Sequence, residues 1–167
     1  MPFSKAYVAF LFHFHSDRDY FECHEVLEDH WKNNGMARDS IWVGLIQMAV
    51  SFYHYRRGNI KGSVKLIDKA IRLLSYKEEE VLALGINYEE LIGKLNRSKV
   101  RMVHKMPYKP INIPINNQLL LTICKKQSAI QGYTFENLID EAPDKIVNKH
   151  TLRKKQIVVP EKNFALI

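Results

Sequence analysis

The chain has 167 residues, 46% of them hydrophobic and 26% charged, with two cysteines and a net charge of +7. This composition is ordinary for a globular protein, so it excludes wholesale disorder, and the length suits one domain whose core needs no disulfides. The two cysteines lie about a hundred residues apart, which excludes a metal-type cysteine motif and favours a cytoplasmic protein over a secreted scaffold.

Apolar residues recur at helical spacing through the first hundred positions and predict five to six helices. Capping side chains mark where several of these helices begin, namely Ser16 or Asp17, Asp39 or Ser40, Asn59 and Asn87. Gly58 marks the end of the third helix. The predicted helices cover residues 4–14, 18–33, 40–57, 60–75, 78–84 and 88–103.

The pattern changes after residue 104. Three prolines between residues 106 and 114 exclude a helix there and predict an extended strap laid over the helices. Residues 119–129 fit a helix or a strand, because a short apolar run does not discriminate between the two. Beyond them we expect two short helices and then a possible extended piece, at residues 136–139, 142–150 and 157–160.

The sequence therefore predicts an all-α protein, an antiparallel bundle of five to six helices with an extended, partly irregular C-terminal segment. We place the bundle at residues 1–104 and the segment at residues 105–167, packed on the bundle or tethered to it. The segment is basic: residues 1–98 hold 13 basic and 13 acidic residues, whereas residues 99–167 hold 12 and 5. A contact with a polyanion would accordingly use residues 99–167.

The second predicted helix carries an unusual face. Positions 24 and 28 would be apolar in a purely structural helix, yet His24 and Glu28 stand there, one turn apart. A charge inside an apolar stripe is costly unless it is paired or used. The residues that share this face are Tyr20, Cys23, His24, Leu27, Glu28 and Trp31.

The third predicted helix is apolar nearly all round, which is typical of a helix in the middle of a bundle. Its polar exceptions, Gln47, Ser51 and His54, share one face. If the second and third helices pack antiparallel, His24 and Glu28 face Gln47 and His54 and form a polar pocket in the core. By contrast, we expect His13 and His15 to form the end of an amphipathic first helix.

Three interpretations of this polar group stay open. The side chains can form a satisfied buried network with no further role. They can instead line a pocket for a small molecule, built from His24, Glu25, Glu28, Trp31, Gln47 and His54. A divalent metal is also possible, with His24, Glu28 and His54 as ligands. Whether the protein is an enzyme stays open too; a hydrolytic role would use Glu25 or Glu28 as base.

Parts of these helices resemble a known family. Residues 20–31 read Y-F-E-C-H-E-V-L-E-D-H-W, and residues 44–59 contain G-L-I-Q and end in Y-H-Y-R-R-G-N. This order is similar to the signature of the bacterial family called domain of unknown function 309, and the match covers about residues 15–75. The resemblance implies a small all-α fold of antiparallel helices and no assigned activity.

Partner classes follow from the charge and the apolar runs. The longest uncharged run, residues 40–55, is shorter than the ~18–20 residues that span a bilayer, so no membrane segment is expected. One alternative function is a protein-interaction module with a basic tail. Another is nucleic-acid binding through residues 99–167, although no recognisable reading module is present there.

Overall fold

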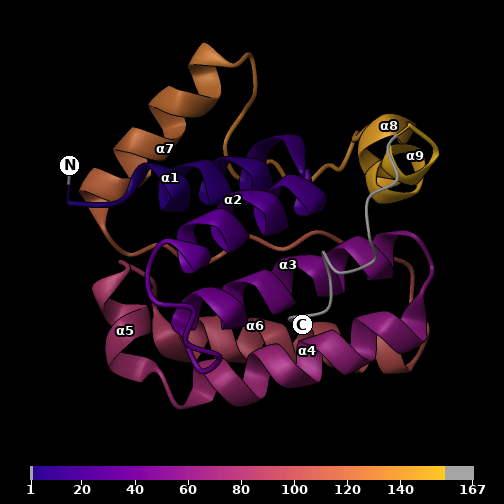
Figure 1. The fold of residues 1–167 in the computed structure, drawn as a ribbon, viewed down its shortest axis with the longest axis horizontal. Helices are drawn as coiled ribbons and strands as arrows, with labels where there is room; N and C mark the ends of the chain where they lie inside the picture. The colour runs from indigo at the N-terminus through magenta and orange to yellow at the C-terminus, as the bar shows by residue number, and fades with distance from the viewer. Residues whose placement is uncertain (1, 157–167) are drawn as a thin grey trace.

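The computed structural model describes residues 2–156, with side chains described through Leu152. Within this range the regular elements are all helical, which confirms the all-α class (Figure 1). In chain order they are α1 (Lys5–Phe12), the π-helical turn η1 (His13–Asp17), α2 (Tyr20–Lys32), α3 (Ile41–Arg56), α4 (Ile60–Ser75), α5 (Glu78–Ala83), α6 (Tyr88–Val103), α7 (Gln118–Ile130), α8 (Asp144–Val147) and α9 (Lys149–Gln156).

The six helices predicted before residue 104 are all present, and capping side chains set the starts of all of them except α5. Ser40, Asn59 and Asn87 each accept a hydrogen bond from a backbone N–H in the first turn of the helix that follows. The main departure is at α2, where the prediction that Ser16 or Asp17 caps the helix was wrong. Asp19 is the cap, through the N–H of Glu22, so α2 begins two residues later than predicted. Between α1 and α2, residues His13–Asp17 form η1, a turn that the sequence pattern did not predict.

Helix α3 is the centre of the bundle, packed against α2 on one side and α4 on another, with α6 beyond α4 (Figure 1). It is buried along nearly its whole length, as its apolar surface predicts. The close approach of α3 and α4 depends on Gly44, because a Cβ there would lie 2.8 Å from Cδ2 of Leu74. The short loop between α2 and α3 makes these two helices antiparallel neighbours.

The proline-rich segment after α6 is extended, as predicted, and it is held by polar contacts along its length. Its backbone exchanges hydrogen bonds of 2.8 Å with the turn before α6, from the N–H of Asn87 to Pro114 O and from the N–H of Asn116 to Gly85 O. The buried side chain of Ile113 lies in the same hydrophobic core as the first helices. The predicted domain boundary at residue 104 stays a prediction.

The C-terminal region continues with three helices. Residues 119–129, which fitted a helix or a strand, form α7, and α7 packs on α1 (Figure 1). Residues 136–139 are irregular, so the helix predicted there was wrong, and residues 142–150 contain α8 and the start of α9. The possible extended piece at 157–160 lies outside the described residues. Among the described helices, none combines the length and apolarity that a bilayer crossing requires.

Candidate functional site

The histidine and glutamate singled out on the second helix form a short ion pair. The His24 Nε2 atom lies 2.7 Å from Glu28 Oε2, and the other oxygen of Glu28 lies 2.6 Å from Lys32 Nζ. On its other side, His24 Nδ1 lies 3.6 Å from Glu25 Oε1. His24 is only 1% exposed and Glu28 only 6%, so an imidazole and a carboxylate share a dry position on the inner face of α2.

This arrangement favours the charged form of both partners. Burial alone would lower the pKa of His24, but the carboxylates of Glu25 and Glu28 outweigh it and raise that pKa above its ordinary value. Burial alone would raise the pKa of Glu28, but His24 and Lys32 hold it below its ordinary value. The pair therefore keeps both partners charged over a wider pH range than either would be without the other.

The other predicted site residues lie at different places along the two helices. Trp31 is buried, and its indole N–H donates to Ala37 O at 2.8 Å, which ties down the loop before α3. Gln47 is 7% exposed, and within the described part of the chain its carbonyl oxygen accepts no hydrogen bond. His54 is half-buried near Asn59 at the end of α3, and burial, with help from Arg57, lowers its pKa.

Ring contacts fix how α2 and α3 are aligned. Phe21 lies opposite Tyr53, with ring centroids 6.1 Å apart, and His30 lies opposite Trp42 at 4.7 Å. If α2 and α3 run antiparallel and are aligned by these two contacts, Gln47 lies at a height along the helix axis between those of His24 and Glu28. His54 lies about two turns further along α3, roughly 10 Å from Gln47 along the helix axis. The structure thus brings His24, Glu25 and Glu28 together, whereas Gln47 shares only their level along the helix axis and His54 lies further toward the end of α3.

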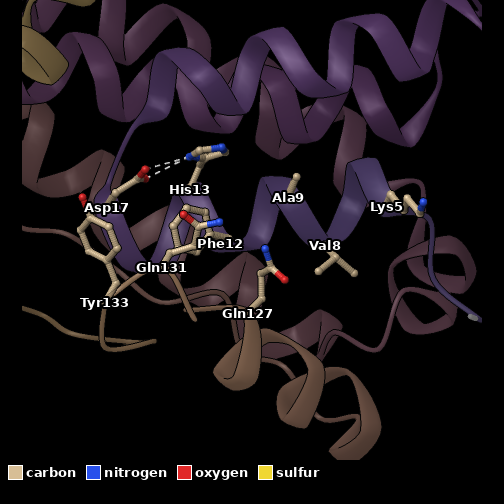
Figure 2. Close-up of a pocket in the computed structure, with 9 residues that line it drawn as sticks. All are labelled: Lys5, Val8, Ala9, Phe12, His13, Asp17, Gln127, Gln131 and Tyr133. Carbon is tan, nitrogen blue, oxygen red and sulfur yellow. Dashed lines mark hydrogen bonds and ion pairs between the residues drawn. The ribbon is translucent and has the colours of Figure 1, made fainter. Parts of the chain in front are cut away.

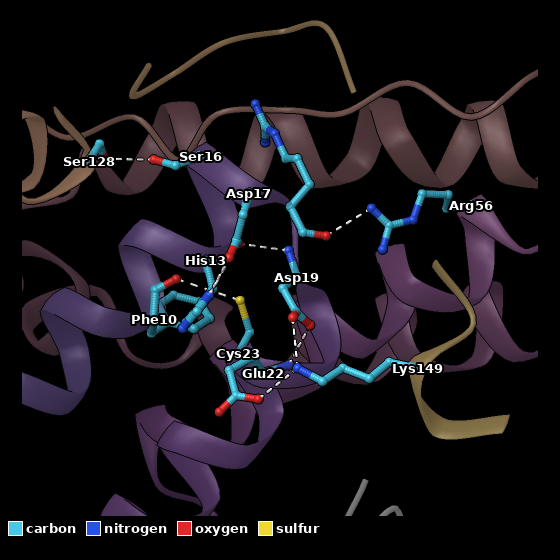
Figure 3. Close-up of polar contacts among 11 residues, drawn as sticks. Phe10, His13, Ser16, Asp17, Asp19, Glu22, Cys23, Arg56, Ser128 and Lys149 are labelled. Carbon is cyan, nitrogen blue, oxygen red and sulfur yellow. Dashed lines mark hydrogen bonds and ion pairs between the residues drawn. The ribbon is translucent and has the colours of Figure 1, made fainter. Parts of the chain in front are cut away.

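Helix α9 lies against one end of the contact between α2 and α3, which we call the seam. The His150 ring lies 5.3 Å from the ring of Tyr53 and 6.4 Å from that of Phe21, and His150 Nδ1 is hydrogen-bonded to the Tyr53 hydroxyl. The neighbouring Lys149 reaches the start of α2, where its Nζ lies 2.8 Å from Asp19 Oδ2 and 3.0 Å from Glu22 Oε2 (Figure 3). The C-terminal region thereby contacts both helices of the candidate site.

The metal and nucleic-acid interpretations gain no further support from these contacts. Within residues 2–156, no group of three or more His, Cys, Asp or Glu side chains is placed to hold a metal ion. Of the basic residues between positions 99 and 152, Lys149 is paired with two carboxylates and Lys99 with Asp68. Both interpretations stay predictions from the sequence.

A second histidine–carboxylate pair escaped the sequence reasoning. His13 Nδ1 lies 3.0 Å from Asp17 Oδ2 and 3.1 Å from Oδ1, within the π-helical turn η1 (Figure 3). The expectation that His13 and His15 form an amphipathic helix end was wrong for His15, which is completely buried. His13 and Asp17 are four residues apart, as are His24 and Glu28. This spacing is the signal that could have identified the His13–Asp17 pair.

The turn that carries this pair is anchored from the C-terminal region. His15 donates from Nδ1 to Leu11 O and accepts at Nε2 from the N–H of Ile113, each at 2.8 Å, and burial lowers its pKa to about 3, so it is neutral. Arg18 follows with φ of 56°, a left-handed conformation that is unusual outside glycine. Its buried guanidinium donates to four oxygen atoms, those of Phe14 O, Ile111 O, Asn112 Oδ1 and Asn137 O.

These features define a small all-helical protein with a buried imidazole–carboxylate pair on its second helix, beside a central third helix. The family model described as Domain of unknown function (DUF309) matches residues 7–66. "Uncharacterized protein YpuF" of Bacillus subtilis (strain 168) is 34% identical over 161 residues, which is 96% of this chain and 92% of that protein. The chain belongs to the DUF309 family, as the resemblance implied, and its relative supports a bacterial origin. No solved structure matches it significantly.

Proposed function

We propose that this protein binds a small polar molecule at the seam between α2 and α3, near His24, Glu25 and Glu28 of α2 and at the level of the buried Gln47 of α3. The observation that carries the proposal is the buried carbonyl oxygen of Gln47, which accepts no hydrogen bond within the described residues. Leaving such a group unsatisfied in a core costs about 1–3 kcal/mol. A cost of that size is readily explained if a bound molecule supplies the missing donor.

The chemistry of the seam limits what the molecule is. The acceptor on Gln47 requires an N–H or O–H donor from the ligand, and Glu25, whose side chain is 29% exposed, adds a carboxylate that also accepts. His24 and Glu28 already neutralise each other, and Lys32 makes a further pair with Glu28. We therefore expect a neutral or singly cationic molecule with amine, amide or hydroxyl groups, rather than a polyanion.

A metal ion fits this seam less well than an organic molecule. Metal binding requires a neutral imidazole, whereas the carboxylates of Glu25 and Glu28 raise the pKa of His24 and favour its proton. An ion would have to displace both that proton and the close contact between His24 and Glu28. Elemental analysis and native mass spectrometry distinguish a bound metal ion from a bound organic molecule.

The test is native mass spectrometry, with elemental analysis, of the protein purified from cells without added metal. We expect a retained organic mass that is lost on denaturation and lost in Gln47→Leu, which keeps the size of the side chain but removes its polar atoms. The matched control is Gln118→Leu on the exposed first turn of α7, which should keep the retained mass.

Two results would count against the proposal. A wild-type protein that carries no organic mass, together with a Gln47→Leu variant that melts higher than wild type, would show a purely structural polar group. A stoichiometric metal lost in His24→Asn would replace the small molecule with the metal site.

A further inference from the structure

A cavity of about 560 Å³ lies between α1 and α7, away from the seam of α2 and α3. Figure 2 shows it running along α1, with Lys5 at one end and the His13–Asp17 pair at the other. Its volume is in the range of small-molecule sites. The residues that line it are Lys5, Val8, Ala9, Phe12, His13, Asp17, Gln127, Gln131 and Tyr133.

The π-helical turn gives the cavity a fixed proton acceptor. Asp17 contacts His13 Nδ1 through both oxygens, and Asp17 Oδ1 also accepts the backbone N–H of Asp19 at 3.0 Å, so the carboxylate cannot rotate freely. A carboxylate at Nδ1 keeps the proton on that nitrogen. The lone pair of the imidazole is then on Nε2, and within the described residues this atom makes no hydrogen bond.

The backbone around the pair is unusual in two ways. A π-helical turn is rare and is often found at functional sites, and the left-handed Arg18 that ends it costs about 1–3 kcal/mol. Hydrogen bonds of the Arg18 and His15 side chains to residues outside the turn hold it in this conformation. A regular continuation of α1 would avoid the strain, so the strained turn is maintained at a cost in stability.

The distribution of polar and apolar groups defines the shape of the ligand. Lys5 and His13 are eight residues apart on one helix, which separates them by about 12 Å along its axis. Between them the wall is apolar, formed by Val8, Ala9 and Phe12. Tyr133, which follows α7, packs edge-on against Phe12, with ring centroids 5.7 Å apart, at the end of the cavity near Asp17 (Figure 2).

From this geometry we propose a second binding site, for an elongated amphipathic carboxylate that carries a hydroxyl group at its far end. Lys5 binds the carboxylate, the apolar wall packs along the hydrocarbon body, and the hydroxyl donates to Nε2 of His13. The amides of Gln127 and Gln131 face the ligand from α7. Asp17 is a positioning residue, which acts only through the tautomer and orientation of His13.

The experiment uses isothermal titration calorimetry of the full chain with two probes, ω-hydroxydecanoate and decanoate, which differ only in the terminal hydroxyl. We expect ω-hydroxydecanoate to bind about tenfold more tightly than decanoate, the effect of one additional hydrogen bond. In Asp17→Asn the two probes should bind equally, because the lone pair of His13 is no longer held on Nε2. Lys5→Met should weaken both probes about tenfold.

Control variants separate the cavity from nonspecific binding of an amphiphile. Ala9→Leu fills the cavity and should abolish binding of both probes, whereas Ala129→Leu, on the exposed side of α7, should change neither. Lys5 and Ala9 are not fully buried, so these variants are expected to fold. The proposal is overturned if neither probe binds, if Ala9→Leu binds like wild type, or if the preference for the hydroxyl survives in Asp17→Asn.

Discussion

The pair on α2 and the pair in η1 use the same elements, a histidine and a carboxylate four residues further on, in opposite ways. His24 and Glu28 stand on a regular α-helix, almost completely buried, and Lys32 extends the pair into a chain of three charges. His13 and Asp17 stand on a π-helical turn, with side chains 20% and 11% exposed, beside a cavity. The backbone and the surroundings, rather than the residue types, decide whether such a pair is enclosed or open to a ligand.

The largest loss of stability is expected from removing Arg18, whose guanidinium holds η1 in place. In Arg18→Ala, a buried guanidinium that makes four hydrogen bonds is lost, and carbonyl groups from three parts of the chain lose their donor. We expect the free energy of unfolding to fall by about 4 kcal/mol, because hydrogen bonds to a charged group contribute about 1.5–3 kcal/mol each and are not additive. Urea denaturation measures the loss, and a loss below about 1 kcal/mol would show that the turn does not depend on Arg18.

The same chemical change at the two pairs sharpens the contrast. Glu28→Gln leaves the buried ring of His24 without the carboxylate that lies closest to it, and we expect a loss of about 2 kcal/mol, moderated because Glu25 still faces the ring. Asp17→Asn affects a pair with more solvent access and keeps an oxygen for the N–H of Asp19, so about 0.5 kcal/mol is expected. Equal losses in thermal or urea unfolding would contradict the distinction drawn between the two pairs.

The smallest effect is the pH dependence of the α2 pair. The pKa of His24 is raised, so its contribution to stability is complete below its ordinary value of 6.5 and is lost as the pH rises through the raised pKa. The pKa of Glu28 is lowered, so its contribution is complete above its ordinary value of 4.5 and is lost as the pH falls through the lowered pKa.

The stability difference between wild type and His24→Asn should therefore be largest between pH 4.5 and 6.5 and should narrow on both sides. Urea unfolding at a series of pH values gives this curve. Asp68→Asn, which removes an exposed partner of Lys99, is the control and should show a smaller difference. A difference that grows above pH 8 would mean that His24 is neutral in the folded protein.

Local features of the sequence were sufficient for most of the fold and for one of the two pairs. Capping residues such as Asn59 and Asn87 act within a few positions of themselves, so the helix starts were predictable. The bond between His24 and Glu28 follows from their spacing on a regular helix.

What the sequence did not reveal depends on partners far along the chain. His15 looked like a polar helix end because its acceptor role toward Ile113 involves a residue 98 positions away. Arg18 likewise bonds Asn137, 119 positions away. These contacts produce η1 in place of a regular end to α1, and no local period or capping signal reports them. Residues 136–139 were misjudged for the same reason, since the hydrogen bonds of Asn137 and Glu136 to Arg18 and Asn112 hold them irregular.

The long-range anchoring of η1 has a consequence for biosynthesis. His15 and Arg18 leave the ribosome well before Ile111, Asn112, Ile113 and Asn137, which at usual elongation rates of about 5–20 residues per second means a delay on the order of 5–20 s. During that interval the guanidinium of Arg18 and the imidazole of His15 lack the partners that they have in the folded protein. The native turn at residues 13–17 can therefore be completed only after most of the polypeptide has emerged.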